Sequence, residues 1–462
     1  MGTEIEASLL PPQERESIKM VLLGTFVAVC GAFEYGISVG YSSPTEDAII
    51  SDLGLSLSQY SVFGSILTIG GMVGAISSGR IADLLGRKGA MATSAAICIV
   101  GWIAIAFSKA AWVLDLGRLA GGFGVGVFSY VVPVYVAEIA PKDLRGGLTT
   151  ANQLMVALGS SIAYLVGQFV TWRVLALVGI VPCIVQVIGL FFIPESPRWL
   201  AKVGRQADFE SALRKLRGKD ANISQEESEI KDYTELQSLL PKTRIQDLFQ
   251  KKYAHSVIVG VGLMVFQQFG GANAIVFYAS NIFVSAGFSS GKVGSIAVAI
   301  IQVPITLLGA ILLDKSGRKP LLMVAAAGTC LGCLLAGTSF LFKAQHWATK
   351  AVPALNLTGI LVFTAFYSLG MGAIPWVMMS EIFPINIKGI AGSLVTLVNW
   401  FGSWAVTYSY NYLESWSAAG TFYIYSAVSA VAIVFVLKLV PETRARTLEE
   451  IQSSMASLGI FS

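Results

Sequence analysis

Long apolar blocks that carry almost no charge restrict the fold of this chain more than any other sequence feature. Such blocks occupy 21–32, 92–107, 174–193, 321–342 and 420–440. A helix needs roughly 20 mostly apolar residues to cross the hydrocarbon core of a bilayer. Only 13% of the 462 residues are charged, about half the share that is usual in soluble domains. The chain is therefore expected to be an all-α membrane protein.

Hydropathy predicts twelve transmembrane helices. Several exceed the minimum length, which favours tilted or kinked helices. The 47 glycines suit close helix packing, because a small residue lets two backbones approach each other. We expect the spans near 20–41, 60–80, 90–107, 112–137, 149–170, 173–193, 253–283, 291–313, 319–342, 352–383, 387–412 and 418–440.

The distribution of Lys and Arg predicts the orientation, because cytosolic loops of membrane proteins are enriched in these residues. With a cytosolic N-terminus, most of the 32 basic residues fall on the cytosolic side, and Arg118 falls within a span. The outer side then carries Lys109, Arg173, Lys292, Lys343 and Lys350. The net charge of +4 is thus a signal of membrane orientation and does not indicate a nucleic-acid partner.

Nothing in the sequence predicts a metal site, a cofactor or an enzyme. The five cysteines all fall within apolar spans, where a small buried hydrophobe is the expected role. The two histidines, His255 and His346, lie near predicted span ends without a metal or catalytic partner nearby in the sequence. There is no nucleotide-binding loop either. The cysteines are Cys30, Cys98, Cys183, Cys330 and Cys333.

The two halves of the chain repeat the same motifs in the same order. A Gly-Arg-Lys turn preceded by an aspartate follows the second span at 83–88 and the eighth span at 314–319. A Pro-Glu-Ser or Pro-Glu-Thr segment follows the sixth and the twelfth span. A six-helix unit has therefore been used twice, which is the architecture of carriers whose two bundles rock around a site at the bilayer midplane.

The repeated charges are all predicted to be cytosolic. Acid and base seven residues apart, as in Glu138/Arg145 and Glu381/Lys388, can bridge a helix end to its neighbour. We interpret the set as a gate that holds the halves together when the outer side is open. The alternative is a static surface network, in which each exposed pair contributes only about 0–1 kcal/mol. The set comprises Asp83, Arg87, Glu138, Arg145, Glu195, Arg198, Asp314, Arg318, Glu381, Lys388, Glu442 and Arg444.

The duplication divides the chain into two bundles and a polar connection. The segment between the bundles is rich in charge, and its parts 208–217 and 224–240 have helical composition. We expect a cytosolic tail at 1–19, an N-terminal six-helix bundle at 20–193, a cytosolic helical linker at 194–252, a C-terminal six-helix bundle at 253–440 and a cytosolic tail at 441–462.

These motifs resemble the sugar porters of the major facilitator superfamily over nearly the whole chain. The resemblance is carried by the loop at 79–88, Pro-Glu-Ser-Pro-Arg-Trp-Leu at 194–200, Gln267-Gln268 with Asn273, Ile-Pro-Trp at 374–376 and Pro-Glu-Thr at 441–443. Gly-Tyr-Ser-Ser-Pro at 40–44 and Asn-Trp-Phe at 399–401 are similar to the plant early-responsive-to-dehydration-type branch. That resemblance implies a monosaccharide transporter, with hexoses and above all glucose as substrates.

Several amides fall on predicted spans and suit a sugar, because an amide both donates and accepts hydrogen bonds. For any one of them, a contact between helices is an equally good explanation. Local unwinding would bring Gln267, Gln268 and Asn273 together. The resemblance assigns sugar contacts to six amides: Gln153, Gln267, Gln268, Asn273, Gln302 and Asn399. Gln302 stands where the family usually has an asparagine. Trp376 would supply an apolar platform for the sugar ring. It also suggests Phe277 and Trp400 as gate aromatics.

Proton coupling is left open by the first span. The resemblance places Ser38 where proton-coupled relatives carry an aspartate, and matches Arg118 to the arginine that pairs with it. Serine cannot cycle a proton, which favours facilitated diffusion. Glu34 lies one helical turn before Ser38, however, and a carboxylate within a span is a functional candidate. The alternatives are a permanent Glu34–Arg118 pair or a glutamate that reaches the membrane surface.

The sequence leaves alternatives for the substrate, the role and the location of the protein. The same fold could carry a polyol or another small solute, or act as a low-flux sugar sensor, although its predicted tails are short. A monomer is expected. The segment 6–10 is similar to an acidic di-leucine signal and favours the vacuolar over the plasma membrane.

Overall fold

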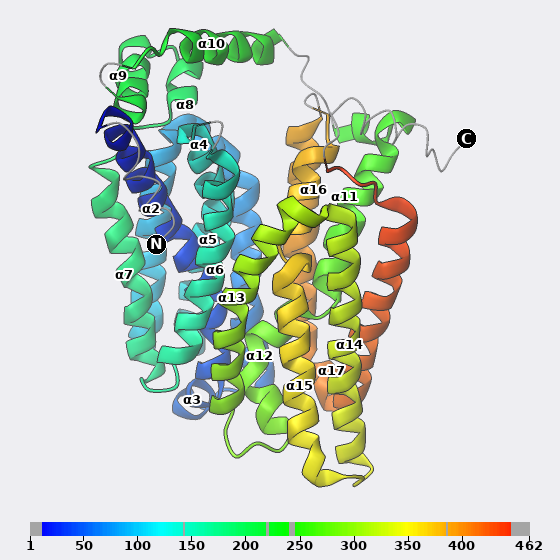
Figure 1. Cartoon of the computed structure of the whole chain (residues 1–462). Helices are drawn as coiled ribbons and strands as arrows, with labels where there is room; N and C mark the ends of the chain where they lie inside the picture. Colours follow the sequence, from blue (N-terminus) through cyan, green and yellow to red (C-terminus); the bar gives the residue numbers. More distant parts are fainter. Residues whose placement is uncertain (1–11, 142–143, 219–220, 240–244, 385–386, 445–462) are drawn as a thin grey trace.

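The computed structural model describes residues 12–141, 144–218, 221–239, 245–384 and 387–444. The sorting motif expected at 6–10 lies outside these ranges. Within them the chain is helical and arranged as two bundles side by side (Figure 1). The helices of the first half are α2 (Pro12–Gly40), α3 (Ser42–Leu53), α4 (Leu57–Ala106), α5 (Ala111–Ile139), α6 (Arg145–Val166) and α7 (Trp172–Leu190).

Three short helices follow the first bundle and cover one end of it. They are α8 (Pro197–Lys202), α9 (Gln206–Arg217) and α10 (Ser224–Leu239), followed by the 3-10 turn η1 (Ile245–Phe249). We refer to this end of the molecule as the linker end and to the other as the α3 end (Figure 1). The positions of α9 and α10 agree with the helical composition of 208–217 and 224–240.

The second bundle repeats the first with more interruptions. Its elements are α11 (Lys251–Phe269), α12 (Ala272–Ser285), α13 (Lys292–Ser316), α14 (Arg318–Ala344), the 3-10 turn η2 (Thr349–Ala351), α15 (Val352–Phe366), the π-helical turn η3 (Tyr367–Met371), α16 (Ile374–Ile382) and α17 (Lys388–Leu439).

Twelve spans are present, although the described residues contain nine helices that are each long and apolar enough to cross a membrane. Two of the nine contain a pair of spans. The 50-residue α4 turns at Gly86, whose φ is +77°, and the 52-residue α17 breaks at Ser417. The twelfth span is α6, whose apolar part, Thr150–Val166, is shorter than the others. The expected all-α fold of two six-helix bundles is therefore confirmed.

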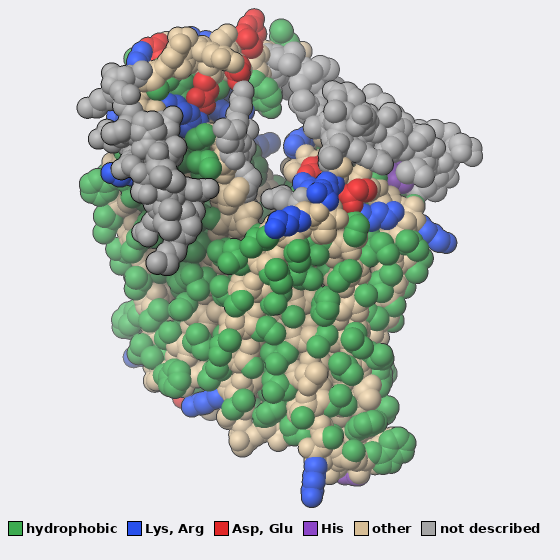
Figure 2. Space-filling model, viewed as in Figure 1, with side chains coloured by type: hydrophobic (Ala, Val, Ile, Leu, Met, Phe, Trp, Pro, Cys, Tyr) green, Lys and Arg blue, Asp and Glu red, His purple; other side chains and the backbone are tan. Residues whose placement is uncertain are grey.

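The outer surface of the bundles is apolar and suited to lipid. Val73 and Ile300 are 53% and 64% exposed, which would be costly in water for so many large side chains. In Figure 2, hydrophobic side chains cover the visible wall, while charged side chains gather mostly at the linker end. The surface thus has the band structure of a protein embedded in a bilayer.

One helix was not expected from hydropathy. The segment 42–53 contains Glu46, Asp47 and Asp52, so it reads as a loop, yet it folds into α3. This helix ends in the left-handed Gly54. It packs against α12 of the other half, where the backbone N–H of Ser280 donates to the Ser43 hydroxyl at 2.9 Å.

Glycines let the helices within the first bundle touch. A Cβ added to Gly36 of α2 would lie 2.1 Å from the carbonyl oxygen of Val156 in α6, and one added to Gly126 of α5 would lie 2.1 Å from that of Gly71 in α4. Both approaches are too close for any side chain. Gly121, also on α5, has open space at the corresponding point.

This contrast predicts opposite effects of the same substitution on one helix. Gly126→Ala should lower the free energy of unfolding by about 1–3 kcal/mol, because the methyl group must force α4 and α5 apart. Gly121→Ala should be neutral or stabilising by up to about 1 kcal/mol, because alanine favours the helix. Thermal unfolding in detergent measures both. Equal losses in the two variants would show that this helix contact is not the cause.

Candidate functional site

A break in the second bundle brings three predicted amides together. The helix stops at Phe269, Gly271 takes a φ of +91°, and α12 starts at Ala272. The side-chain N–H of Asn273 therefore reaches back to the Gln268 oxygen and also donates to Ser403 Oγ at 2.6 Å. Broken helices at membrane depth are where carriers build binding sites.

Gln267 connects this break to a second irregular segment. Its amide N–H groups donate to the carbonyl oxygens of Met371 and Gly372 at 2.8 and 3.0 Å, where η3 interrupts the tenth span. Its oxygen accepts from Asn399 of α17 at 2.8 Å and from Gln268 at 3.3 Å. Asn399 is 6% and Gln267 2% exposed. The buried amides thus satisfy one another, as polar groups away from water must.

Gln302 of α13 joins the two halves. Its amide nitrogen donates to the carbonyl oxygen of Ala157 at 2.7 Å and to the hydroxyls of Ser160 and Ser161, all on α6. Gln153 lies one helical turn before Ala157 on α6 and is half-buried. In this conformation, Gln302 is a cross-bundle contact.

The predicted aromatic residues occupy different positions. Trp376 is half-buried in the first turn of α16, directly after Pro375. Phe277 is buried on α12. Trp400 of α17 stacks on Tyr35 of α2, with ring centroids 6.0 Å apart, and lies against Gly71 of α4, so it fills the space between the halves.

Glu34 and Ser38 form a buried pair on α2. The Ser38 hydroxyl donates to Glu34 Oε1 at 2.9 Å, and the indole N–H of Trp102 donates to the same oxygen at 2.8 Å. The other carboxylate oxygen, Oε2, has no hydrogen-bond partner among the described residues. Glu34 is fully buried, so it does not reach the membrane surface.

Arg118 of α5 lies close to this pair without bonding to Glu34. Its guanidinium donates to the Ser38 carbonyl oxygen at 2.7 Å and to the Ser42 hydroxyl. It lies over the rings of Tyr41 and Phe63, 5.6 and 5.1 Å from their centroids. Carbonyl, hydroxyl and ring faces therefore stabilise this charge, and no Glu34–Arg118 ion pair joins these two described residues in this conformation.

Two thiols lie beside Glu34. Atoms of Glu34, Cys98 and Cys183 that could act as ligands lie within 4.8 Å of one another. All five cysteines are free, and only Cys330 is not buried. In this arrangement, the thiols contribute a polarizable wall to the Glu34 site.

The linker end of the first bundle carries a carboxylate clamp. Arg87 donates from Nε and Nη2 to the two oxygens of Glu138, each at 2.8 Å. Glu195 accepts the backbone N–H groups of Arg87 and Lys88, both at 3.1 Å. A Cβ on Gly86 would lie 2.4 Å from Glu195, so the clamp requires glycine there for space as well as for φ.

The second bundle repeats this clamp. Arg318 donates to Glu381 Oε1 at 2.9 Å, and Glu442 accepts the backbone N–H groups of Arg318 and Lys319, each at 3.0 Å. Gly317 has a φ of +91°, and a Cβ on it would lie 2.8 Å from Glu442. The two halves therefore repeat the hydrogen bonds of the clamp as well as its sequence motifs.

Of the two acid–base pairs expected within motifs, Glu381 and Lys388 form no described ion pair, whereas the pairing of Glu138 with Arg145 stays a prediction. Glu138 and Glu381 pair with arginines from the neighbouring Gly-Arg-Lys turns, because the turn brings the arginine under the end of the following helix. Lys388 instead donates to the Ser380 carbonyl oxygen at 2.8 Å. The side chains of Arg145 and Asp314 lie outside the described part.

The remaining members of the set make peripheral contacts. Asp83 pairs with Lys202 of α8 at 2.9 Å, Arg198 lies over the ring of Tyr233, and the backbone N–H of Arg444 donates to Glu442. The described ion pairs at the linker end each join segments of the same half.

The two clamps differ in their electrostatics. Burial outweighs the N–H donors at Glu195 and raises the pKa of that carboxyl. At Glu442, burial also acts to raise the pKa, but the backbone N–H groups of Arg444, Arg318, Lys319 and Thr443 together hold the pKa below its ordinary value.

Contacts between the halves are found at the α3 end instead. The Asn411 amide of α17 donates to Ser61 Oγ of α4 at 3.0 Å, and the Tyr164 hydroxyl of α6 donates to the Val276 carbonyl oxygen of α12. Together with the Ser43–Ser280 contact, these bonds close the α3 end. This conformation is therefore closed at the α3 end, and its clamps at the linker end do not cross between halves.

Sequence reasoning missed several residues at these sites. Trp102 and Ser42, the partners of Glu34 and Arg118, sit among apolar or small residues that give no local signal. Glu46 and Glu414 were also missed, since each was assigned to a connection near a predicted span end. Only the packing of distant segments reveals their burial.

A duplicated twelve-helix bundle with amides at its broken helices and repeated clamps at one end defines a membrane transporter of the major facilitator fold. The chain belongs to the sugar transporter family: residues 19–455 match the family described as "Sugar (and other) transporter". The enzyme class is not supported, because this family consists of transporters.

Individual relatives agree with this assignment. The chain is 61% identical over 441 residues to "Sugar transporter ERD6-like 16" of Arabidopsis thaliana, covering 96% of this chain and 92% of that protein. It is 59% identical over 434 residues to "Sugar transporter ERD6-like 7" of the same plant, covering 94% of both. The resemblance to the plant early-responsive-to-dehydration-type branch is therefore confirmed.

Solved structures of a bacterial sugar carrier share the fold. The proton:xylose symporter XylE bound to 6-bromo-6-deoxy-D-glucose has a TM-score of 0.79 at 26% identity and covers 95% of this chain and 100% of that chain. The inward-open conformation of XylE from E. coli has a TM-score of 0.80 at 26% identity, covering 94% and 99%.

The second clamp predicts a pH-dependent stability. Because the pKa of Glu442 is lowered on folding, its stabilising effect is complete above its ordinary value, about 4.3, and is lost as the pH falls through the lowered pKa. Glu442→Gln should lower the free energy of unfolding at neutral pH by about 1–3 kcal/mol and should show a smaller loss on acidification. Thermal unfolding across pH tests this. Asp232→Asn, at an exposed position of α10, is the control, and the same acid profile in Glu442→Gln and the wild type would contradict the role.

Proposed function

We propose that this protein carries a monosaccharide, with glucose as the first candidate, by alternating access between its two bundles. The observation that supports this most directly is the set of amides at the broken helices, of which Gln267, Gln268 and Asn399 are buried and Asn273 is half-buried. Gln267, Gln268, Asn273 and Asn399 already exchange hydrogen bonds there, and each can offer a donor and an acceptor to sugar hydroxyls. Binding a sugar would exchange these bonds for bonds to the substrate.

The substrate site would include further residues from both halves. Gln302 of α13 bonds to α6, the helix that also carries Gln153, and Trp376 would lie against the sugar ring. Phe277 and Trp400 would act as gate aromatics, with Trp400 stacked across the halves on Tyr35. Each of these roles is a proposal.

The conformation suggests how the cycle proceeds. Contacts between the halves close the α3 end, while each clamp at the linker end stays within its own half. With the linker end in the cytosol, as the basic residues indicate, this is a state closed to the outside. We propose that the repeated charges exchange partners between the halves when the α3 end opens.

The linker and the tails would then be cytosolic, with bundles at 20–193 and 253–440. A vacuolar membrane is proposed over the plasma membrane, and a monomer over an oligomer. A polyol carrier and a low-flux sensor remain the alternatives. A sensor would bind sugar in the same site but exchange it slowly.

Loss of one amide should weaken transport without unfolding the protein. Gln267→Ala should raise the half-saturating sugar concentration by about two- to tenfold, because a hydrogen bond to the substrate contributes about 0.5–1.5 kcal/mol. Counterflow of labelled glucose in proteoliposomes measures this, with fructose and polyols as competitors. Gln206→Ala, at an exposed position at the start of α9, is the control.

Counterflow also separates the alternatives. Competition by a polyol stronger than by glucose would favour the polyol carrier, and binding without counterflow would favour the sensor. Unchanged glucose counterflow in Gln267→Ala would reject the amide site.

Of the two coupling modes, Glu34 supports proton coupling. Both of its donors bond to Oε1, and Oε2 has no described partner. This is the arrangement expected for a carboxyl group that carries its proton on Oε2. Ser38 would hold the carboxyl in place, and Arg118, held by the Ser38 carbonyl and the Ser42 hydroxyl, would favour release of the proton on approach.

Sugar-driven proton movement tests this. Wild-type protein in proteoliposomes should change the internal pH when a sugar gradient is applied, and Glu34→Gln should transport sugar without that change, because an amide does not ionise in this range. Trp102→Phe, which removes one donor to Oε1, should retain proton movement. Equal proton movement in the wild type and Glu34→Gln would reject Glu34 as the site, and none in either would favour facilitated diffusion.

A further inference from the structure

A second buried carboxylate lies at the α3 end, far along the sequence from the amides. Glu46 of α3 is only 3% exposed, and neither of its oxygens has a hydrogen-bond partner in the described structure. An ionised carboxylate without partners is among the most costly groups to bury. Its neighbour Asp47, by contrast, is exposed to solvent.

The groups that face Glu46 do not supply a positive partner. It interacts electrostatically with Asp47 on its own helix and with Glu414 of α17, in the other half. The tyrosines around it are Tyr60 of α4, Tyr278 of α12 and Tyr410 of α17. The nearby cations are directed elsewhere: Arg118 to Ser38 and Ser42, Arg173 to the Trp172 ring and the Ala106 carbonyl oxygen, and Lys343 to the Ser285 carbonyl oxygen.

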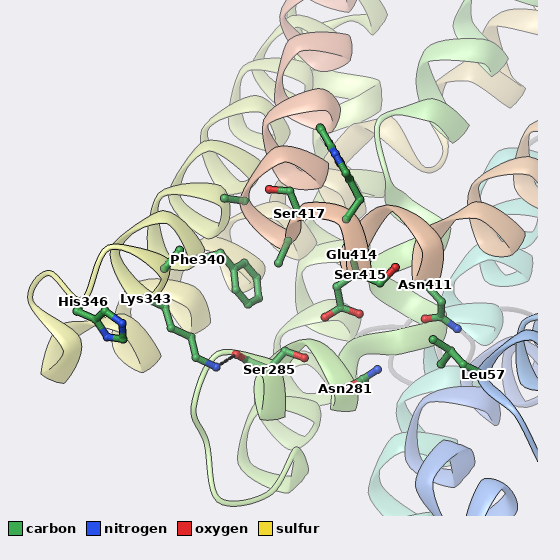
Figure 3. Close-up of a pocket in the computed structure, with 14 residues that line it drawn as sticks. Leu57, Asn281, Ser285, Phe340, Lys343, His346, Asn411, Glu414, Ser415 and Ser417 are labelled. Atoms are coloured by element: carbon green, nitrogen blue, oxygen red, sulfur yellow. Dashed lines mark hydrogen bonds between the residues drawn. The ribbon is translucent and has the colours of Figure 1, made fainter.

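Glu414 connects this buried position to the solution. It lines a cavity of about 650 Å³ at the α3 end, with Asn281, Ser285, Lys343 and Asn411. Figure 3 shows the Glu414 carboxylate pointing toward α12, between the labelled Ser285 and Asn411. Asn411, which also lines this cavity, donates a hydrogen bond to Ser61 of the first half. Glu414 therefore borders a cavity that water can enter, whereas Glu46 does not line that cavity and is nearly inaccessible.

The interface between these two carboxylates is the one that must part in alternating access. Glu46 belongs to the first half and Glu414 to the second, and the Ser43–Ser280 and Ser61–Asn411 bonds lie on the same interface. Opening the α3 end would hydrate Glu46. Closing it removes water from Glu46 and brings a second carboxylate near.

We propose that Glu46 is a proton-binding site that is filled from the solution at the α3 end when that end closes. The solvent supplies the proton, which adds to a carboxylate oxygen of Glu46, so that Glu46 and Glu414 together carry at most one negative charge in the closed state. The proton returns to the same solution when the end opens. The inference rests on the proposed alternating-access cycle and assigns a second proton to it, separate from Glu34.

The sign of the pH effect follows from this difference. In the closed state, burial and the charges of Asp47 and Glu414 raise the pKa of Glu46, on α3 beyond the first apolar span, well above its ordinary value. In the open state, the hydrated carboxyl has a pKa near its ordinary value. The closed state therefore binds the proton more tightly, and acidification shifts the population toward closure, by up to about tenfold per pH unit for one linked proton.

Distance measurements between the halves test this directly. Spin labels at the exposed positions Ser51 on α3 and Gln345 after α14, introduced as Ser51→Cys and Gln345→Cys, would report opening of the α3 end in the full chain in lipid nanodiscs. Protein without these substitutions gives the background from the native cysteines. Lowering the pH from about 8 to about 5 should shift the wild-type distances toward the shorter, closed population.

Four variants separate Glu46 from other acids. Glu46→Gln should be largely closed at every pH, because the amide needs no proton. Asp47→Asn, one residue away and exposed, should keep a pH response, as should Glu34→Gln. Glu414→Gln should keep the response with its midpoint at lower pH, since a like charge is removed, and it tests the idea even if Glu46→Gln does not fold.

Two results would overturn the inference: distances independent of pH in the wild type, or the same pH response in Glu46→Gln as in the wild type. An unchanged midpoint in Glu414→Gln would remove Glu414 from the site. Glucose counterflow by the same wild-type protein keeps the proposed function distinct. If counterflow is present but the distances do not change with pH, only the proposed second proton site is rejected. The absence of counterflow would contradict the transport function itself.

Discussion

The absence of water in the bilayer core is the constraint on which this structure depends. Every backbone and side-chain polar group there must find a partner within the protein. Within a helix, the backbone groups bond to one another. Where a helix breaks, side-chain amides bond to the backbone groups that are left free. Gln267 is the clearest case, because it binds the free carbonyl oxygens of Met371 and Gly372 and also joins Asn399. The groups that repair the broken backbone are thus the same groups that can hold a polyhydroxyl solute.

At the linker end, glutamate carboxylates rather than amides supply the hydrogen-bond partners of free backbone groups. In each half, one glutamate accepts hydrogen bonds from the backbone N–H groups of a Gly-Arg-Lys turn. This glutamate is Glu195 in the first half and Glu442 in the second. The carboxylates also crowd Gly86 and Gly317, which leaves no room for a side chain. These clamps stiffen each bundle without joining the two. In the proposed cycle the bundles move as units, the contacts at the α3 end part, and the repeated charges exchange partners between the halves.

Two buried carboxylates show how position decides what an acid can do. Glu34 has two donors and a nearby arginine, so its environment can hold it in either protonation state. Glu46 has no partner and faces Glu414 across an interface. In our proposals, Glu34 binds a proton at the centre of the bundle and Glu46 binds one when the α3 end closes. A chain with two such acids can link its conformations to pH at more than one step.

The sequence by itself determined the class of fold, because apolar length, basic-residue bias and repeated motifs are local or additive properties. It also identified the amides and predicted that Gln268 and Asn273 converge through unwinding, since both are read from one segment. It paired Glu381 with Lys388 where the structure pairs it with Arg318, it did not foresee that Arg87 bonds to Glu138, and it treated the helix that carries Glu46 as a connection. Those features depend on which helices pack together, and only the tertiary structure decides that, because a side chain's charge state and partners are set by residues hundreds of positions away.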